Sequence, residues 1–326
     1  MGKDTPAVGR ARAATFRTLM LDASAAEAVA LLARHDVPSI LLKGRGIATW
    51  LYVGEVRSYC DVDLLVDPAQ REQAMEVLAT IGYRHHLAGA DVAEYGSNET
   101  ELVSPAGVVI DLHHTLLGVD GSAERCWKVL SARTTELRVG GQVVPVLDED
   151  ARTMHLALHA AQNGPADVKA LADLERGLEQ LPLSRWREAA RTARELDAEP
   201  AFSAGLRVSA LGRDMAAALG LRPPTDVTLL LRTRSAPAEA LQIQRFVELR
   251  TLGGRLHLVG RKLWPTTAYM RGTVPGARAG APALLAARLR RMVGLPAKFR
   301  VAFRSWSEAR HTAHMMTFDR MGENHL

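Results

Sequence analysis

The sequence predicts an α/β protein of the α+β type, in which a mixed sheet is followed by helices. Strand-like and helical hydrophobic periods alternate over the first part of the chain, and the helical period dominates after it. The length of 326 residues also exceeds that of most single cores. We therefore expect a sheet domain at residues 1–147, a helical domain at 148–222 and a mainly helical region at 223–326.

The first predicted elements are a helix, a strand and a second, short helix. Ser24 and Glu27 have the spacing of a helix capping box, so we expect a helix at 24–35. The apolar run VPSILLKG at 37–44 is entered by a proline and stopped by a glycine, which suits a buried strand. Residues 45–54 then suit a short helix.

The next segments predict the rest of the sheet. CDVDLLVD at 60–67 alternates as a strand does, and 68–83 opens with a first-turn proline and closes on a glycine, as a helix should. Two further alternating segments, 98–103 and 107–116, flank the turn sequence SPAG. They predict an antiparallel hairpin, and hence a mixed sheet.

Helical periodicity marks the remainder of the chain. Prolines and glycines separate the periodic segments, and Arg222-Pro223-Pro224 is the clearest linker. The helices expected are 147–164, 166–181, 184–196, 236–252 and 281–292.

Composition describes an ordinary globular protein, with 47% apolar and 24% charged residues. No signal peptide is indicated, and no apolar run approaches about 18 residues, so we expect a cytoplasmic protein without membrane insertion. From Arg232 to the end there are 17 Lys and Arg against 5 Asp and Glu. Such a segment can attract phosphate-rich polymers or acidic membranes, but we favour a solvated helix face. The sequence does not indicate an oligomeric state.

Three aspartates are the candidate catalytic and metal-binding residues. Asp61 and Asp63 lie at positions i and i+2 of a predicted strand, so their carboxylates should point to the same face. Asp111 lies among apolar residues in VVIDLHH and is a candidate third ligand. Mg²⁺, with Mn²⁺ as the alternative, is bound by few carboxylates together with phosphate oxygens. Three acids on adjacent strands could therefore hold two metal ions at a phosphoryl site.

Three residues upstream are candidates for nucleotide binding. Lys43 and Gly44 lie at the junction between a predicted strand and the helix that follows it. Backbone amides at such a junction can hold phosphate oxygens. Lys43 adds a positive charge, and Gly44 lets the backbone approach a ligand because it has no Cβ. Arg57 precedes Asp61 by four residues and could reach a phosphate or the acids.

His155 and His159 are interpreted as structural residues rather than metal ligands. His155 and His159 have the i, i+4 spacing of a helical metal site, but the general-base glutamate of an HExxH motif is missing because Leu156 follows His155. A packing or capping role is favoured for both.

The ordered set of motifs resembles the DNA polymerase β-like nucleotidyltransferase superfamily, and within it an uncharacterised branch of nucleotidyltransferase family proteins. The resemblance covers about residues 20–220. The motifs that carry it are Leu42-Lys43-Gly44, Tyr52, Arg57, Asp61-Val62-Asp63-Leu64-Leu65-Val66, Asp111-Leu112-His113, Leu156-Ala157-Leu158-His159-Ala160-Ala161 and Leu171-Ala172-Asp173-Leu174. The commonest members of the superfamily have Gly-Ser where this chain has Lys43-Gly44, which leaves the choice of nucleotide open.

The resemblance implies a polymerase β-like core and a metal-dependent transfer of a nucleoside monophosphate from a nucleoside triphosphate to an acceptor hydroxyl. Asp61, Asp63 and Asp111 would bind the metals, and Lys43, Gly44 and Arg57 the triphosphate. Pyrophosphate would leave. The acceptor is open among RNA, a protein, a small metabolite and an antibiotic. Two alternatives are a catalytically silent nucleotide- or nucleic-acid-binding module with the same fold and, more distantly, a phosphohydrolase.

Overall fold

The structure is a computed structural model that describes residues 6–85 and 98–323. Contacts divide the described residues into two compact units. The sheet unit contains residues 6–85, 98–156 and 176–199, and the helical unit contains 157–175 and 200–323. The three-domain division given above stays a prediction.

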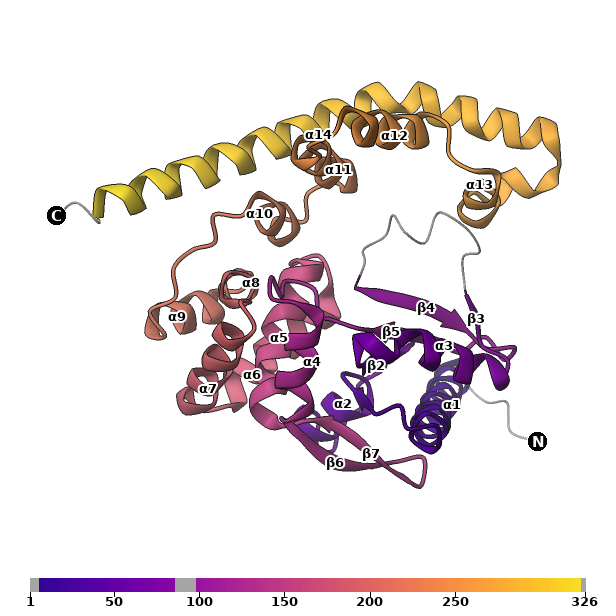
Figure 1. Ribbon diagram of the computed structural model, residues 1–326, viewed down its shortest axis with the longest axis vertical. Helices are drawn as coiled ribbons and strands as arrows, with labels where there is room; N and C mark the ends of the chain where they lie inside the picture. Colours follow the sequence, from indigo (N-terminus) through magenta and orange to yellow (C-terminus); the bar gives the residue numbers. More distant parts are fainter. Residues whose placement is uncertain (1–5, 86–97, 324–326) are drawn as a thin grey trace. The chain divides into compact units, whose positions relative to one another are not determined.

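The sheet unit is built on a mixed sheet, as predicted (Figure 1). Within the described residues the strand order is β3-β4-β5-β2-β1-β7-β6. The pairs β1/β7 and β2/β5 are parallel, and the other neighbouring pairs are antiparallel. The strands are β1 (Ser39–Leu41), β2 (Val62–Val66), β3 (Arg84–His85), β4 (Glu99–Val103), β5 (Val109–His113), β6 (Thr134–Val139) and β7 (Gln142–Leu147).

Local sequence signals account for the central strands and their connections. β1, β2, β4 and β5 lie in the segments predicted to be strands. The hairpin turn between β4 and β5 closes where the Gly107 amide donates to the Ser104 carbonyl, 2.9 Å away. The short helix α2 (Arg45–Leu51) follows β1 and the 3-10 turn η1 (Pro68–Gln70) leads into α3 (Arg71–Thr80), both as expected. The strands β6 and β7 had no predicted counterpart.

The first helix is longer than predicted. Helix α1 runs from Pro6 to Arg34, so Ser24 lies in its interior and the expected N-cap there is wrong. Neither proline nor glycine interrupts the chain between Arg10 and Arg34, and Leu21, Ala25 and Ala28 continue one apolar face through Ser24. That continuous face, which is buried, explains why the helix does not begin at the capping-box sequence.

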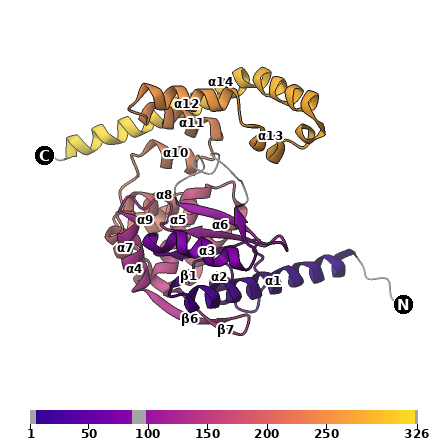
Figure 2. The same ribbon diagram turned by 45° about the vertical axis from the view of Figure 1, so that its right-hand side comes forward.

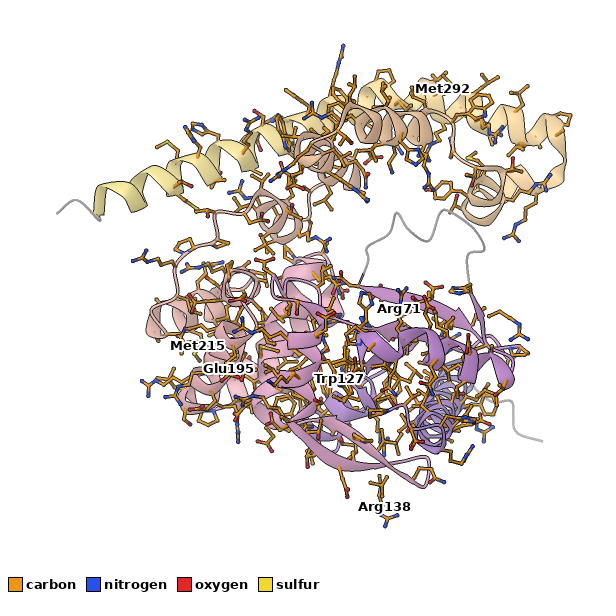
Figure 3. All side chains as sticks on the ribbon, viewed as in Figure 1. Arg71, Trp127, Arg138, Glu195, Met215 and Met292 are labelled. Atoms are coloured by element: carbon orange, nitrogen blue, oxygen red, sulfur yellow. The ribbon has the colours of Figure 1, made fainter. Side chains whose placement is uncertain are left out.

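Helices α1 and α3 lie side by side on one face of the sheet (Figure 2). The residues of β2 that alternate toward them, Val62, Leu64 and Val66, are buried in the same core cluster as side chains of both helices. Arg71, labelled in Figure 3, ties the start of α3 to this face by donating to the Thr100 hydroxyl of β4 at 2.6 Å. Asp63 of β2 points to the opposite face of the sheet, together with the fully buried Leu65.

Two arginines hold the segment around α2. Arg152 donates to the Gly46 carbonyl at 2.9 Å, and its guanidinium lies 4.8 Å from the centre of the Trp50 ring. Arg176 stacks in the same way over Tyr52, with 4.3 Å between the guanidinium carbon and the ring centre. Cation–π contacts with aromatic rings stabilise such positions, so α2 is fixed at both ends beside the site.

One helix, α4 (Ala123–Ser131), lies between β5 and β6. After β7 the described elements are all helical. The helices that follow are α5 (Glu149–Asn163), α6 (Val168–Gln180), α7 (Leu183–Glu195), α8 (Glu199–Leu206), α9 (Ala210–Ala218), α10 (Val227–Thr233), α11 (Ala238–Glu248), α12 (Leu252–Leu263), α13 (Thr267–Thr273), the 3-10 turn η3 (Pro275–Ala279) and α14 (Ala281–Glu323). Side-chain caps begin several of them: the Ser209, Asp226, Thr251 and Thr266 oxygens accept from amides three residues on. No described helix is long and apolar enough to cross a membrane.

Two helices of the basic region differ from the prediction. The segment 236–252 is mostly α11, but a new helix, α12, begins at Leu252. Helix α14 continues past the expected end at residue 292, through Pro296, to Glu323. Packing explains the continuation, because Ala302, Trp306 and Ala309 of α14 are buried in a core cluster with α10 and α11.

Candidate functional site

Strands β2 and β5 place two of the predicted aspartates side by side. The two strands are parallel, and Asp63 pairs in register with Asp111. Because Val62, Leu64 and Val66 face the core beneath α1 and α3, Asp63 points to the opposite face of the sheet. The same alternation puts Asp111 and His113 on that face, since Ile110 and Leu112 belong to the core cluster. The two strands thus bring together residues 48 positions apart in the chain.

Asp63 is the centre of the arrangement. It is only 2% exposed, and its Oδ1 lies 2.6 Å from the Lys43 Nζ and 3.2 Å from the His113 Nε2. Burial by itself would raise the pKa of this carboxyl, but the Lys43 charge and the His113 hydrogen bond outweigh it and hold the pKa well below its ordinary value. Asp63 is therefore an ionised carboxylate in a buried position.

Lys43 reaches Asp63 from the loop between β1 and α2. The Leu42 amide donates to the Asp63 carbonyl at 3.0 Å, which continues the β1–β2 pairing up to the loop. Gly44 follows with φ +60°, a conformation that favours glycine. Burial opposes the charge on Lys43, yet the surrounding carboxylates, Asp63 first, raise its pKa above the ordinary value. Lys43 remains a cation with its side chain 20% exposed.

A hydrogen-bond network supports this loop from outside. The Tyr59 hydroxyl donates to Asp22 of α1, and the Arg45 guanidinium lies 3.6 Å from the other Asp22 oxygen. The Tyr59 ring packs beneath Gly44, where a Cβ would lie 3.5 Å from it. Burial and the Asp22 hydrogen bond raise the pKa of Tyr59, so it stays a neutral donor. The network fixes the loop that carries Lys43.

Asp111 is surrounded by negative charge. Burial first, and then the charges of Asp63 and Glu99, raise its pKa to about 7 against the opposing effect of His113. Strand β4 supplies two of the carboxylates on this face, since Glu101 pairs in register with Asp111 and Glu99 with His113. The Glu99 Oε2 lies 3.2 Å from the His113 Nδ1.

Glu99 and Glu101 were not among the predicted site residues. Their i, i+2 spacing within NETELV was a usable signal, because it places both on the face opposite Leu102 of the core. What the spacing could not supply was the register that sets Glu101 beside Asp111.

The two other predicted site residues flank the start of β2. Asp61 immediately precedes the strand and is half-buried, and its carboxylate accepts from the Cys60 Sγ at 3.6 Å. Arg57 lies in the segment between α2 and β2 and is 6% exposed. Both predicted residues thus belong to the segment that leads into the Asp63 strand.

His155 of α5 is a further residue of the site. It is buried beside Leu42 and forms a hydrogen bond with the Leu42 backbone. The charges of Lys43, Asp63 and His113 act on its pKa. Burial lowers its pKa to about 3, so the ring is neutral near pH 7. The expectation of a packing role fits this burial, but no sequence signal placed His155 behind the Lys43–Asp63 pair. His159, in the same helix, contacts the Asn163 amide at 2.9 Å.

Comparison with protein families gives a match to the model for uncharacterised nucleotidyltransferases over residues 8–212, more than half of the chain. The chain belongs to this nucleotidyltransferase family. The resemblance drawn from its motifs is thereby confirmed. No curated protein matches the chain significantly.

Solved structures similar to this family member include nucleotidyltransferases. The antibiotic-resistance factor ANT(2'')-Ia is 17% identical, over 56% of this chain and 94% of its own, with a TM-score of 0.38. The lincosamide antibiotic adenylyltransferase LnuA is 17% identical over 47% of this chain and 92% of its own, with a TM-score of 0.33. An antigenic nucleotidyltransferase-like protein from Paracoccidioides brasiliensis is 12% identical over 65% and 95%, with a TM-score of 0.33.

The three predicted carboxylates fit a divalent cation in their chemistry. Asp61, Asp63 and Asp111 offer carboxylate oxygens, which Mg²⁺ and Mn²⁺ accept. Burial first, and then the nearby carboxylates, raise the pKa of Asp111, and a cation would neutralise the charge of those carboxylates. Within the described ranges no three His, Cys, Asp or Glu side chains are already arranged around one metal position, and the Lys43 ammonium contacts Asp63 instead.

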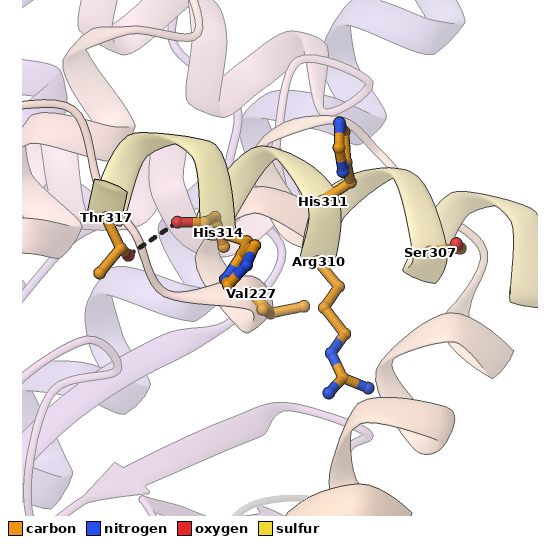
Figure 4. A pocket seen from close by; sticks show the side chains of 7 residues that line it. Val227, Ser307, Arg310, His311, His314 and Thr317 are labelled. Atoms are coloured by element: carbon orange, nitrogen blue, oxygen red, sulfur yellow. Dashed lines mark hydrogen bonds between the residues drawn. The ribbon is translucent and has the colours of Figure 1, made fainter. Parts of the chain in front are cut away.

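A separate cavity lies in the helical unit (Figure 4). Its volume is about 570 Å³, and Val227 of α10 lines it together with Arg310, His311 and His314 of α14. The dashed line in Figure 4 is the bond from the Thr317 hydroxyl to the Ala313 carbonyl. None of the lining residues belongs to the carboxylate face of the sheet.

Proposed function

We propose that this family member transfers a nucleoside monophosphate from a nucleoside triphosphate to an acceptor hydroxyl and releases pyrophosphate. The observation that carries the proposal is the pairing of Asp63 with Asp111 on one face of the sheet, with the Lys43 ammonium 2.6 Å from Asp63. Transfer at phosphorus requires anionic ligands for metal ions and a cation for the phosphates, and these three residues supply both within one site.

Asp61, Asp63 and Asp111 would hold the metal ions, Mg²⁺ or Mn²⁺. When bound, such ions neutralise the phosphate charge and polarise the reacting oxygens. This assignment is supported by the register that pairs Asp63 with Asp111 and by the position of Asp61 directly before the strand. His113, hydrogen-bonded to Asp63 and 3.2 Å from Glu99, would fix the orientation of the Asp63 carboxylate.

Lys43, the Gly44 amide and Arg57 would hold the triphosphate. The Lys43 side chain has a flexible stem and is partly exposed, so its ammonium could turn from Asp63 to a phosphate oxygen. Gly44 has no Cβ and lets phosphate approach the backbone. The Tyr59–Asp22 hydrogen bond would keep the loop in position during this exchange.

In the reaction the acceptor oxygen forms a bond to the α-phosphorus as the bond to the β-phosphate oxygen breaks. Asp111 lies beside Asp63 on the neighbouring strand and would accept the proton from the acceptor hydroxyl. The pyrophosphate leaves with the electron pair of the broken bond. Positioning the two reactants on one rigid sheet face contributes to the rate because little freedom remains to be lost.

The test is incubation of the purified chain with each nucleoside triphosphate labelled at the α-phosphate, in the presence of Mg²⁺ and of RNA, protein and small-molecule acceptor pools. We expect label on one acceptor and stoichiometric pyrophosphate. Asp63→Asn should lower this transfer at least about a hundredfold. The matched control is Glu136→Gln on the exposed strand β6, which should leave the rate unchanged.

Two results would argue against transfer, and a third would argue against the proposed site. Triphosphate binding without pyrophosphate release in any pool would favour the silent binding module. Release of nucleoside monophosphate with no acceptor present would instead favour hydrolysis. Near-parental turnover in Asp63→Asn would remove the carboxylate face from the site altogether.

A further inference from the structure

Helix α14 carries an exposed apolar stripe along one side. Leu285, Leu289, Met292, Phe299 and Phe303 follow one another at the spacing of a single helical face, and each side chain is between 39% and 56% exposed. Met292 is labelled on α14 in Figure 3. The rings of Phe299 and Phe303 stack with their centres 5.9 Å apart. Exposed apolar residues that share a face, rather than being scattered, mark an interaction site.

The stripe is distinct from the face by which α14 packs into the helical unit. Ala302, Trp306 and Ala309 form the buried face and contact α10 and α11. Ala302 and Ala309 are about a quarter turn away from Phe299 and Phe303 around the helix, and Trp306 lies between the two faces, with its ring centre 5.4 Å from that of Phe303. The helix is therefore apolar on two sides, and within the described residues of the unit the side chains of the stripe stay at least 39% exposed.

Helix α12 carries a second stripe of the same kind. Leu252, Leu256, Val259 and Leu263 are spaced i, i+4, i+7 and i+11 and are between 41% and 72% exposed. The two stripes approach each other where Trp264, at the end of α12, stacks under Arg288 of α14, with 4.6 Å between the guanidinium carbon and the ring centre. Leu285 lies about one helical turn before Arg288 and Met292 about one turn after it, and Leu289 follows Arg288 directly.

Positive charge flanks both stripes. Between Glu248 and Glu308 the sequence contains twelve Lys and Arg and no Asp or Glu. Exposed ion pairs with Glu239 and Glu308 offset the charges of Lys298 and Arg304. The rest of the segment remains strongly cationic. A partner that covers this surface must therefore be anionic and must also accept apolar side chains.

We propose that α12 and α14 form a docking surface for anionic phospholipid membranes. Amphipathic helices with Lys and Arg beside an apolar face of Leu, Phe and Trp lie in the plane of the headgroups and bury the apolar face. Each basic residue near an anionic leaflet contributes further attraction. RNA would meet the charges but offers little to Leu, Val and Phe, and a second copy of the same surface would meet like charge. No described helix spans a membrane, so the attachment is peripheral.

The experiment is cosedimentation of the full chain with vesicles made of equal parts phosphatidylglycerol and phosphatidylcholine, and with vesicles of phosphatidylcholine alone. We expect binding to the anionic vesicles, weakening as salt rises, and little to the neutral ones. Leu289→Gln/Phe299→Gln keeps every charge and should lower the partition constant about tenfold per substitution. Its control, Val168→Gln/Leu211→Gln, changes exposed apolar residues of α6 and α9 and should bind as the parent does.

A single-stranded RNA oligonucleotide, titrated in parallel, separates the two anionic partners. The proposal is overturned if the parent fails to bind anionic vesicles at low salt, or if Leu289→Gln/Phe299→Gln binds them as tightly as the parent. RNA binding without vesicle binding would also overturn it and would assign the basic segment to a nucleic acid. A blue shift of fluorescence on adding vesicles, lost in Trp264→Phe, would place the end of α12 in the bilayer interface and support it.

Discussion

The contact between Lys43 and Asp63 predicts an asymmetry that can be measured. Lys43→Met removes the ammonium but keeps most of the side-chain length, and leaves the Asp63 carboxylate 2% exposed with His113 as a remaining partner. Asp63→Asn instead leaves the Lys43 ammonium, which is 20% exposed and can turn toward water. The Asp63 carboxylate left by Lys43→Met has no such route to solvent. This substitution should therefore lower the free energy of unfolding more than Asp63→Asn does.

The magnitude follows from the geometry. At 2.6 Å the attraction between unit charges is about 6 kcal/mol for an effective dielectric constant of about 20, and the cost of removing both groups from water offsets much of it. Losing one member of a buried pair typically costs about 3–5 kcal/mol. Because His113 remains, we expect Lys43→Met to lower the free energy of unfolding by about 3 kcal/mol, and the double variant Lys43→Met/Asp63→Asn to recover about 1–2 kcal/mol of that loss.

Urea unfolding at pH 7, followed by tryptophan fluorescence, measures these differences. The control is Arg133→Met, which breaks an exposed pair with Glu195 at 3.2 Å and should cost no more than about 1 kcal/mol. The reasoning is refuted if Lys43→Met costs no more than the control, or if the effects of Lys43→Met and Asp63→Asn simply add in the double variant.

Three other changes have defined outcomes. His155 has a pKa of about 3 in the folded chain and about 6.5 in the unfolded chain, so the unfolded chain binds the extra proton between these values. The free energy of unfolding should therefore fall by about 1.4 kcal/mol per pH unit as the pH drops from about 6.5 towards 3. Urea unfolding at pH 7 and pH 5 should show a smaller loss in His155→Gln. Asp111→Asn should bind Mg²⁺-triphosphate in calorimetry nearly as the parent does, while single-turnover transfer falls by orders of magnitude. Gly44→Ala should cost about 1–3 kcal/mol in thermal unfolding, because φ is +60° there.

Each of these outcomes can fail separately. Equal acid sensitivity in the parent and His155→Gln would mean that the histidine is not buried neutral. Preserved transfer in Asp111→Asn would make Asp111 an ordinary strand acid. An unchanged melting temperature in Gly44→Ala would show that the loop after β1 relaxes to a conformation open to alanine, and triphosphate affinity measured on the same variant would show whether that loop matters for binding.

The sequence by itself determined the elements around the site and the faces of its strands. A strand has a period of two, so the apolar residues of DVDLLV and VVIDLHH already indicated which side of each strand faces the core. They also indicated that Asp63 and Asp111 point to the other side. The turn at Ser104–Gly107 and the glycine after β1 could also be predicted from the sequence, because both follow local preferences of the backbone. The motifs together also indicated the nucleotidyltransferase family, which the match over residues 8–212 confirms.

Only the tertiary structure decided which of these residues meet. The register between β2 and β5, the approach of Lys43 to Asp63, and the position of His155 behind them depend on packing between segments far apart in the chain. Periodicity gives the face of a residue but not its neighbour across strands, so Glu101 could not be placed beside Asp111. Long-range packing also overrode local signals, carrying α1 through Ser24 and α14 through Pro296, because a buried apolar face stabilises a helix more than one unfavourable residue destabilises it.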